Sequence, residues 1–217
     1  MEIHGDNLTL FGLEVNGGGT QNCVILGSGG ESNVAMVAND DTLDHVRLHD
    51  CGNDSHEHAI YAEFTNRLHV TDSYLYGDGG YGLHFYPSAQ NSLVEYSVVD
   101  GNARGSGWSS NVVFAGEAPG GEYLLAHGSR YNVIRYSLIT FPMQNYNVES
   151  YFPSGSLPPV GNEVAFSCLF GAPSGNFDGS NGYTQHDNRA VDPLYTDRSA
   201  HNYLLRAGSP CAGWGPR

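Results

Sequence analysis

Two short segments of the chain place imidazole and phenol groups at matching positions. In "HAIYAE", Tyr61 and Glu63 alternate with apolar residues, and in "GLHFY", His84 and Tyr86 do the same. Successive side chains of a strand point to opposite faces, so an inward Ile60 implies that these four side chains face outward. If the two segments are neighbouring strands about 4.8 Å apart, Tyr61 lies beside His84 and Glu63 lies beside Tyr86.

These residue types suit the elimination or epimerisation of a uronic acid. Either reaction must neutralise the uronate carboxylate, remove the C5 proton, and protonate the leaving oxygen or the opposite face of C5. His84, Tyr61 and Tyr86 are candidates for the base and the acid, and Arg104 or a calcium ion would neutralise the carboxylate. We therefore predict a catalytic group of His84, Tyr61, Tyr86 and Arg104.

Polar loops beside these strands add groups that bind sugars. Aromatic faces pack on the apolar side of a sugar ring, and carboxylates and amides bond its hydroxyls. A straight row of strands also matches a straight polymer, so the predicted partner is a polysaccharide. The expected substrate-binding residues are Asp54, His56, Glu57, His58, Glu63, Asp78, Tyr81 and Trp108.

Other interpretations of the same residues stay open. Hydrolysis of a neutral glycan needs two carboxylates roughly 5 to 9.5 Å apart, which Glu57 or Glu63 would supply together with Asp78. Outward Tyr and His side chains also pack as cross-strand pairs without any chemistry, and a loop such as "NDSHEH" is commonly only solvated. A non-catalytic glycan-binding or surface protein, including a fragment of a larger fibre, fits that last interpretation.

Metal ligands are a further alternative. Asp54, His56 and His58 alternate in an extended segment and would offer oxygen and nitrogen ligands. Residues 40–44 form an acidic corner that could hold calcium, although a solvated turn is the default there. Ca²⁺ is thus a candidate cofactor, with no ligand set assigned.

The elements that must position these groups repeat along the chain. One pattern of alternating apolar residues ending in a Gly, Asp or Asn turn occurs in "NLTLFGLEVNG", "LDHVRLHDCGN", "NRLHVTDSYLYGD", "NSLVEYSVVDGN", "NVIRYSLITF" and "NEVAFSCLFG". A second, shorter strand recurs between them as "NCVIL", "HAIYA", "GLHFY", "NVVFA" and, less clearly, "NVESY". In "NVVFA" the outward positions carry Val113 and Ala115, so the polar patch is expected to end there.

Short strands separated by Gly and Asn bends, with a period that stretches where loops are inserted, are typical of a solenoid. Each turn contacts only its neighbours, so insertions bulge outward. The pattern therefore predicts a parallel β-helix in which coils stack strand on strand. Asn residues at matched corners, including Asn66, Asn91, Asn132 and Asn162, are expected to form hydrogen-bonded ladders between turns.

The phrases "YGDGGYGLHFYPSAQNSLVEYSVVDGN" and "VDPLYTDRSAHNYLLRAGSPCAG" resemble the right-handed parallel β-helix repeat proteins of the pectate-lyase-like superfamily. The resemblance covers nearly the whole chain from residue 7 and is specific for the fold. It implies a carbohydrate-active protein, because the family includes lyases, hydrolases, uronan C5-epimerases, tailspikes and non-catalytic surface proteins. Many lyases of this superfamily use Lys or Arg as base, and this chain has no Lys.

The chain departs from the family pattern at its start, where members usually carry a cap over the first coil. Here the coil pattern begins by Asn7, so an uncapped end is expected to invite association. We predict one all-β domain: coils of a right-handed parallel β-helix over residues 1–171, and an irregular C-terminal arm over 172–217 that packs on the last coils.

Composition narrows the function classes. The 217 residues carry a formal net charge of -14, which argues against nucleic acid because no basic stripe exists to neutralise phosphates. No apolar run is long enough to span a membrane, and the first residues do not read as a secretory signal. We expect a mature or truncated form of a secreted protein rather than a cytosolic one.

The four cysteines lack the spacing of a zinc site. Their pairing stays open, and a Cys168–Cys211 bond would tie the last coil to the tail.

Overall fold

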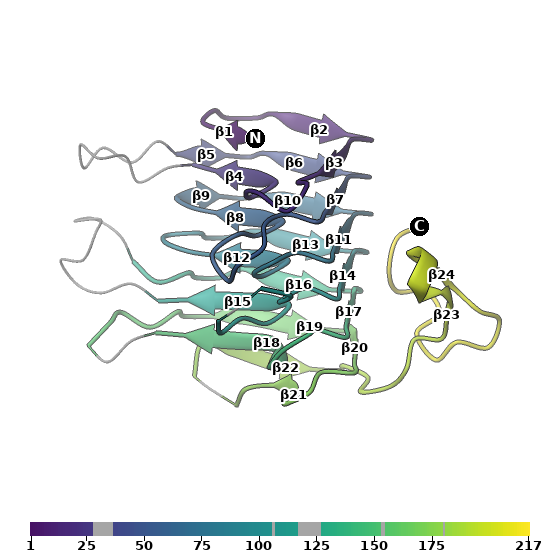
Figure 1. Cartoon of the computed structure of the whole chain (residues 1–217). Coiled ribbons are helices and arrows are strands. Elements are labelled where there is room, and N and C mark those ends of the chain that lie inside the picture. The colour runs from purple at the N-terminus through teal and green to yellow at the C-terminus, as the bar shows by residue number, and fades with distance from the viewer. Residues whose placement is uncertain (28–36, 106, 117–126, 153–154, 180) are drawn as a thin grey trace.

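The computed structural model describes residues 1–27, 37–105, 107–116, 127–152, 155–179 and 181–217. Within them, three long parallel sheets wind into the predicted right-handed parallel β-helix (Figure 1). The first sheet contains β1 (Glu2–Ile3), β4 (Val24–Leu26), β8 (Ile60–Ala62), β12 (Leu83–Phe85), β15 (Val112–Ala115), β18 (Tyr146–Tyr151) and β21 (Gly175–Phe177).

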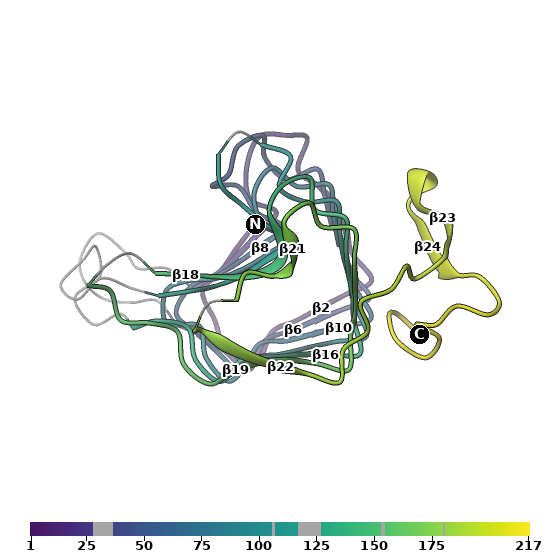
Figure 2. The same cartoon turned by 90° about the horizontal axis from the view of Figure 1, so that it is seen from below.

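The second sheet contains β2 (Thr9–Phe11), β6 (Thr42–Asp44), β10 (His69–Thr71), β13 (Leu93–Glu95), β16 (Val133–Arg135), β19 (Asn162–Ala165) and β22 (Tyr183–His186). The third sheet contains β3 (Glu14–Asn16), β7 (Arg47–His49), β11 (Tyr74–Tyr76), β14 (Val98–Asp100), β17 (Leu138–Thr140) and β20 (Cys168–Phe170). A minor pair, β5 (Ala38–Asn39) and β9 (Thr65–Asn66), lies beside them. Seen along the axis, the three sheets enclose the interior of the coils (Figure 2).

The core follows from the alternation of apolar residues along each strand. Equivalent inward side chains stack in register from coil to coil, as Leu43, Val70, Val94, Ile134 and Val164 do in the second sheet, and all five are fully buried. Each such side chain contributes about 1.5–3 kcal/mol by leaving water. Because every coil repeats the pattern, the register of neighbouring strands is fixed by burial.

Polar ladders hold the corners between the sheets. The backbone N–H groups of Ser73, Ser97 and Ser137 each donate to the serine hydroxyl of the next coil at 3.2 Å. The predicted asparagine contacts are confirmed as two pairs, Asn66 with Asn91 and Asn132 with Asn162. A longer ladder, not singled out in the sequence, runs through Asn102, Asn111, Asn147 and Asn176. These bonds satisfy corner groups that the β ladders cannot reach.

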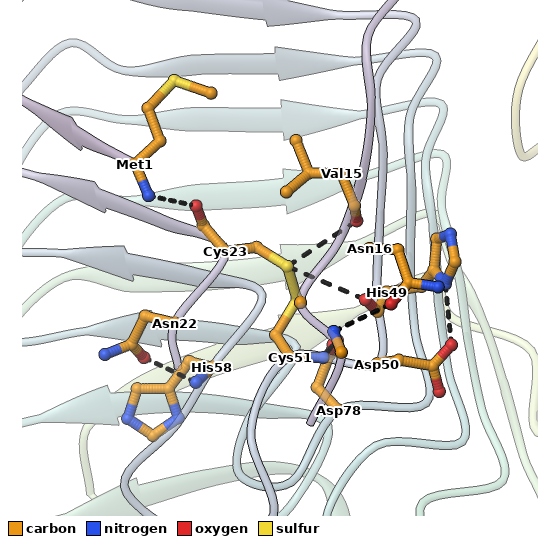
Figure 3. The surroundings of a disulfide bond; sticks show 12 residues. Met1, Val15, Asn16, Asn22, Cys23, His49, Asp50, Cys51, His58 and Asp78 are labelled. Carbon is orange, nitrogen blue, oxygen red and sulfur yellow. Dashed lines mark hydrogen bonds and ion pairs between the residues drawn. A yellow bond between two sulfur atoms is a disulfide. The ribbon is translucent and has the colours of Figure 1, made fainter. Parts of the chain in front are cut away.

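Two disulfides are present: one joins two coils, and the other joins the last strand of the third sheet to the C-terminal arm. Cys23, just before β4, is bonded to Cys51, which follows β7, and Figure 3 shows this bond with its neighbours, among them Val15, His49 and Asp78. The backbone N–H of Cys51 donates to the carboxyl group of Asp78 at 2.8 Å. The second bond joins Cys168 of β20 to Cys211, which confirms the proposed link between the last coil and the tail.

The coils continue past residue 171, the boundary expected from the sequence, because β21 and β22 pair with β18 and β19. The remaining chain forms an antiparallel hairpin of β23 (Tyr195–Asp197) and β24 (Asn202–Leu205), joined by the short 3₁₀ helix η1 (Arg198–Ala200). Figure 2 shows this hairpin outside the coils, on the side of the third sheet.

Charged and phenolic groups dock the hairpin on the third sheet. Arg198 forms an ion pair with the buried Asp100 at 2.9 Å, and the hydroxyl of Tyr203 donates to the same carboxylate at 3.1 Å. The hydroxyls of Tyr195 and Thr140 meet at 3.0 Å. The arm therefore covers the third sheet and leaves the outer face of the first sheet for other contacts.

Candidate functional site

The outward row predicted for the first sheet is present. Tyr61 of β8 and His84 of β12 are paired in register, and their rings stack with centres 4.9 Å apart. The ring of Tyr86 lies 5.6 Å from that of His84 and 6.4 Å from that of Tyr61, so each of the three rings is close to the other two. The backbone N–H of Tyr86 donates to the carbonyl of Ala62, which places Tyr86 alongside Glu63 as expected, although Glu63 is only 7% exposed. Tyr61, His84 and Tyr86 are called the aromatic row below.

A second imidazole lies behind the row. The backbone N–H of Tyr81 donates to Nδ1 of His58 at 3.0 Å, and Nε2 of His58 is 2.8 Å from Nδ1 of His84. A nitrogen that accepts a bond from an N–H carries no proton, so neutral His58 must carry its proton on Nε2 and donate it to His84. Neutral His84 therefore carries its own proton on Nε2.

Both imidazoles are held neutral. Burial lowers the pKa of His58 well below its ordinary value of 6.5, and the neighbouring His84 and His56 lower it further. Burial also lowers the pKa of His84 to about 3, again with a smaller contribution from His56. At neutral pH the pair thus forms one directed chain of hydrogen bonds that ends in a donor, the Nε2–H of His84.

Glycines explain how the loop and the strand approach so closely. A Cβ on Gly80 would lie 2.4 Å from Nδ1 of His58, and a Cβ on Gly82 would lie 2.4 Å from the amide of Asn102. Neither distance is accessible to a real side chain. The "GDGGYG" stretch is therefore required for the contact between the Tyr81 backbone and His58.

The polar patch does not end at Val113 and Ala115, contrary to the expectation from the sequence. The next strand, β18, places Glu149 beside Val113. The Glu149 carboxylate accepts bonds from the Tyr81 hydroxyl at 2.6 Å and the Trp108 indole N–H at 3.0 Å, and the Ser110 hydroxyl donates to it at 2.6 Å. Burial raises the pKa of Glu149, and it raises the pKa of Tyr81 well above 10, with the negative charge of Glu149 adding to the latter shift.

Glu149 was missed as a site residue even though "NVESY" is the fifth copy of the short strand. Aligning that copy with "HAIYA" and "GLHFY" puts Glu149 at the position of Tyr61 and His84. The signal was therefore present in the sequence.

These contacts shape a pocket of about 370 Å³ on the first sheet. The indole of Trp108, which is 62% exposed, and the partly exposed ring of His84 both line it. This volume falls within the range of small-ligand sites. The whole lining consists of Ser55, His56, His58, Tyr81, His84, Trp108, Val113 and Tyr151.

Arg104 lies elsewhere. Its guanidinium forms an ion pair with Asp50 at 3.1 Å, at the turn that follows β7, and it does not line the pocket. The structure therefore does not bring Arg104 together with His84, and the predicted neutralising group of a uronate is not placed beside the aromatic row.

The carboxylates expected for hydrolysis are also not assembled. Asp78 is completely buried in the corner beneath Cys51, so it offers nothing to a substrate (Figure 3). Glu57 accepts bonds from the backbone of its own loop at Asn53, and the exposed Asp54 accepts one from the N–H of His56. None of the hydrolysis candidates Glu57, Glu63 and Asp78 lines the pocket, and neither does Asp54.

Metal ligands are sparse in the described part of the chain. Ligand atoms of three such residues come within 4.8 Å of one another in two groups there: Cys23, Cys51 and Asp78, and Asp44, His45 and Asp72. The cysteines of the first group are bonded to each other, and Asp72 of the second is paired with Arg217. Neither group contains Asp54, His56 or His58. In the acidic corner, Asp40 is paired with Arg67.

No protein-family model matches the chain, and no curated protein sequence matches it significantly. The likeness to β-helix proteins therefore rests on the architecture, which generally fits carbohydrate-active proteins. In the described residues, no helix is long and apolar enough to cross a membrane.

Proposed function

We propose that this protein binds a polysaccharide across the outer face of the first sheet, with one sugar ring in the pocket beside Trp108. The observation that carries the proposal is the continuity between the aromatic row and the pocket. The rings of Tyr61, His84 and Tyr86 form one aromatic surface, His84 belongs both to this surface and to the pocket lining, and the pocket is large enough for a sugar residue.

The pocket walls are preorganised for such a ligand. The polar ends of Tyr81 and Trp108 are tied to Glu149, so both rings are fixed before any ligand arrives. Fixing aromatic side chains in advance reduces the entropy lost on binding. The indole of Trp108 still exposes most of its surface and can pack on the apolar face of a sugar ring.

Charge favours a neutral polymer. The described residues that line the pocket include no arginine, and Glu149, behind them, is a carboxylate. With a formal net charge of -14, the protein repels a polyanion unless a cation intervenes. Burying an anionic group here without a partner would be costly.

Elimination or epimerisation of a uronan is the second candidate function, and the buried imidazole pair favours it. Strongly shifted pKa values in a pocket are typical of catalytic groups. Here the Nε2–H of His84 would stabilise a developing negative charge on a carboxyl oxygen, as a neutral imidazole donor does. Tyr61 and Tyr86 would remove the C5 proton and protonate the leaving oxygen or the opposite face of C5. A calcium ion would have to replace Arg104 as the neutralising charge.

The two disulfides are compatible with an extracellular protein, and we infer that the site works in an oxidising compartment. The exposed apolar residues of the first coil, Leu8, Phe11 and Leu13, stay a candidate surface for the association expected there.

The test is retention of the protein in native gels cast with a panel of neutral and uronic-acid polysaccharides, with and without calcium. We expect retention by a neutral polymer, and we expect Trp108→Ala to abolish it. Phe11→Ala is the matched control, because it removes an aromatic side chain of similar exposure, 65%, from the second sheet.

Incubation with the same polymers tests the second candidate. An unsaturated product with ultraviolet absorbance identifies a lyase, and loss of deuterium or tritium from C5 without chain cleavage identifies an epimerase. If no polymer retains the wild type and none is altered, the proposed function is wrong.

A further inference from the structure

The pocket offers a ligand the Nε2–H of His84, the polar groups of Ser55, His56 and Tyr151, and the exposed indole of Trp108. The Tyr81 hydroxyl and the Trp108 N–H are already bound to Glu149. Nδ1 of His84 is occupied by His58, whereas Nε2 of His84 has no partner within the described part of the structure. Val113, the register neighbour of His84 on β15, is only 1% exposed, so the accessible apolar surface of the lining is that of the Trp108 and Tyr151 rings, which are 62% and 55% exposed.

We propose that His58 is a positioning residue that keeps the Nε2–H of His84 as a permanent hydrogen-bond donor, so that the pocket selects sugars carrying an acetyl group. The carbonyl oxygen of the acetyl group accepts the bond from His84, and its methyl group packs on the exposed aromatic surface of Trp108 and Tyr151. This inference rests on the proposed function, since it names the sugar class that the same pocket takes.

Geometry distinguishes the acetyl group from the other substituents of sugars. An ammonium group is a donor without an acceptor, and it would face the donor of His84. A carboxylate would accept the bond but would meet no arginine among the described residues of the lining, and it would approach the carboxylate of Glu149 behind Trp108. A hydroxyl group can accept the bond but has no methyl group to bury against the rings of Trp108 and Tyr151.

The direction of the donor is set by the backbone. The Tyr81 N–H cannot act as an acceptor, so it fixes the proton of His58 on Nε2, and that proton in turn fixes the proton of His84. Gly80 permits this approach, because a Cβ there would collide with His58. No arrangement of the two neutral rings that keeps both bonds gives His84 an acceptor at Nε2.

Calorimetric titration of matched ligand pairs tests the selection. Acetylated xylan oligosaccharides are compared with the same oligosaccharides after alkaline deacetylation, and N-acetylglucosamine oligomers with glucose oligomers of the same linkage. All four are neutral, so the net charge of the protein does not bias the comparison. We expect the acetylated member of at least one pair to bind about tenfold more tightly, the value of one well-formed hydrogen bond plus a buried methyl group.

Variants of His58 separate positioning from packing. His58→Gln retains an amide oxygen for the Tyr81 N–H and an amide N–H for Nδ1 of His84, so the preference for acetyl groups should persist. His58→Leu removes both bonds and frees the tautomer of His84, so the preference should fall to less than about threefold.

Nitrogen-15 NMR of the imidazole rings reads the tautomer without any ligand. We expect the wild type to show protonated Nε2 and unprotonated Nδ1 in both rings, and His58→Leu to lose this pattern at His84. An unprotonated Nε2 of His84 in the wild type would overturn the inference.

The binding outcomes separate the two claims. Equal affinity for both members of each pair overturns acetyl selection and leaves polysaccharide binding standing. Failure of every oligosaccharide and polymer to bind overturns the proposed function itself.

Discussion

The neutral imidazole pair predicts a specific loss of stability in acid. Burial lowers the pKa of His84 to about 3, against 6.5 for the exposed imidazole of the unfolded chain. Between these two values the unfolded state binds a proton that the folded state does not, so acidification favours unfolding. The contribution of His84 to stability is complete above pH 6.5 and is lost as the pH falls toward 3.

The magnitude follows from the two pKa values. Going from pH 7 to pH 5, protonation of one exposed imidazole stabilises the unfolded chain by about 2 kcal/mol, while His84 in the folded protein stays unprotonated. His58, whose pKa is also lowered, adds a loss of the same sign. The pair should therefore destabilise the folded protein over this interval by more than His84 does alone, in addition to the contributions of other groups.

Urea denaturation at the two pH values measures this loss. The wild type is compared with His84→Gln, whose amide can accept the bond from His58 but does not titrate. The difference in the free energy of unfolding between pH 7 and pH 5 should be about 2 kcal/mol smaller in His84→Gln, and smaller still when His58→Gln is added. Identical pH dependence in all three proteins would refute the reasoning, because it would mean that the folded protein protonates both rings normally.

Four further predictions concern the surroundings of the site. Asp78→Asn should stabilise the protein by about 1–3 kcal/mol at pH 7 in urea denaturation, because the buried carboxyl occupies the place that Asn102 takes one coil later and one of its oxygens lacks a partner among the described residues. Burial raises the pKa of Asp78, so the wild type loses stability as the pH rises above 3.8, and the advantage of Asp78→Asn should shrink in acid. A variant that is less stable than the wild type at pH 7 would contradict this prediction. Glu149→Ala should weaken glycan binding at least about tenfold in calorimetry, because Tyr81 and Trp108 lose their common anchor; unchanged affinity would show that the anchor is unnecessary. Arg104→Ala should leave glycan affinity unchanged and cost less than about 1 kcal/mol of stability, since the ion pair between Arg104 and Asp50 is partly exposed. A large loss of affinity would show that Arg104 contributes to the binding site. Replacing both Cys168 and Cys211 by Ala should cost about 2–4 kcal/mol in thermal or urea unfolding while the pocket still binds, and loss of binding in the folded variant would link the arm to the site.

The aromatic row could be predicted from the sequence because it depends on period alone. In a solenoid, the register of neighbouring strands follows from burial, so matching "HAIYA" to "GLHFY" was enough to place Tyr61 beside His84. The same reasoning predicted that the corner asparagines would pair.

Residues of the turns and loops could not be placed in this way. Arg104 and Trp108 lie in one inserted segment, yet Arg104 meets Asp50 while the indole of Trp108 reaches Glu149. Asp78 looked like a surface acid in "YGDGG" but occupies a corner ladder, where its side chain points inward to the backbone of Cys51. These positions depend on contacts between coils, which alternation within a strand does not encode.

The contact between His58 and His84 could not be predicted from the alternation of residues either. His58 precedes its strand by two residues, at a position where the sequence indicated a solvated loop. Its burial depends on the close approach of the loop at Gly80, which brings the backbone of Tyr81 against its ring. The glycine-rich stretch is evident in the sequence, but the sequence does not show that this stretch packs against His58.

Fluorescence of Trp108 tests the central claim most directly. The chain has two tryptophans, so Trp214→Phe leaves Trp108, in the wall of the pocket, as the sole indole reporter. Titration of this variant with a polysaccharide that retains the wild type should change the indole emission in a saturable way, with the same dissociation constant as calorimetry. Binding that leaves the emission of Trp108 unchanged would place the polysaccharide elsewhere and contradict the proposed site.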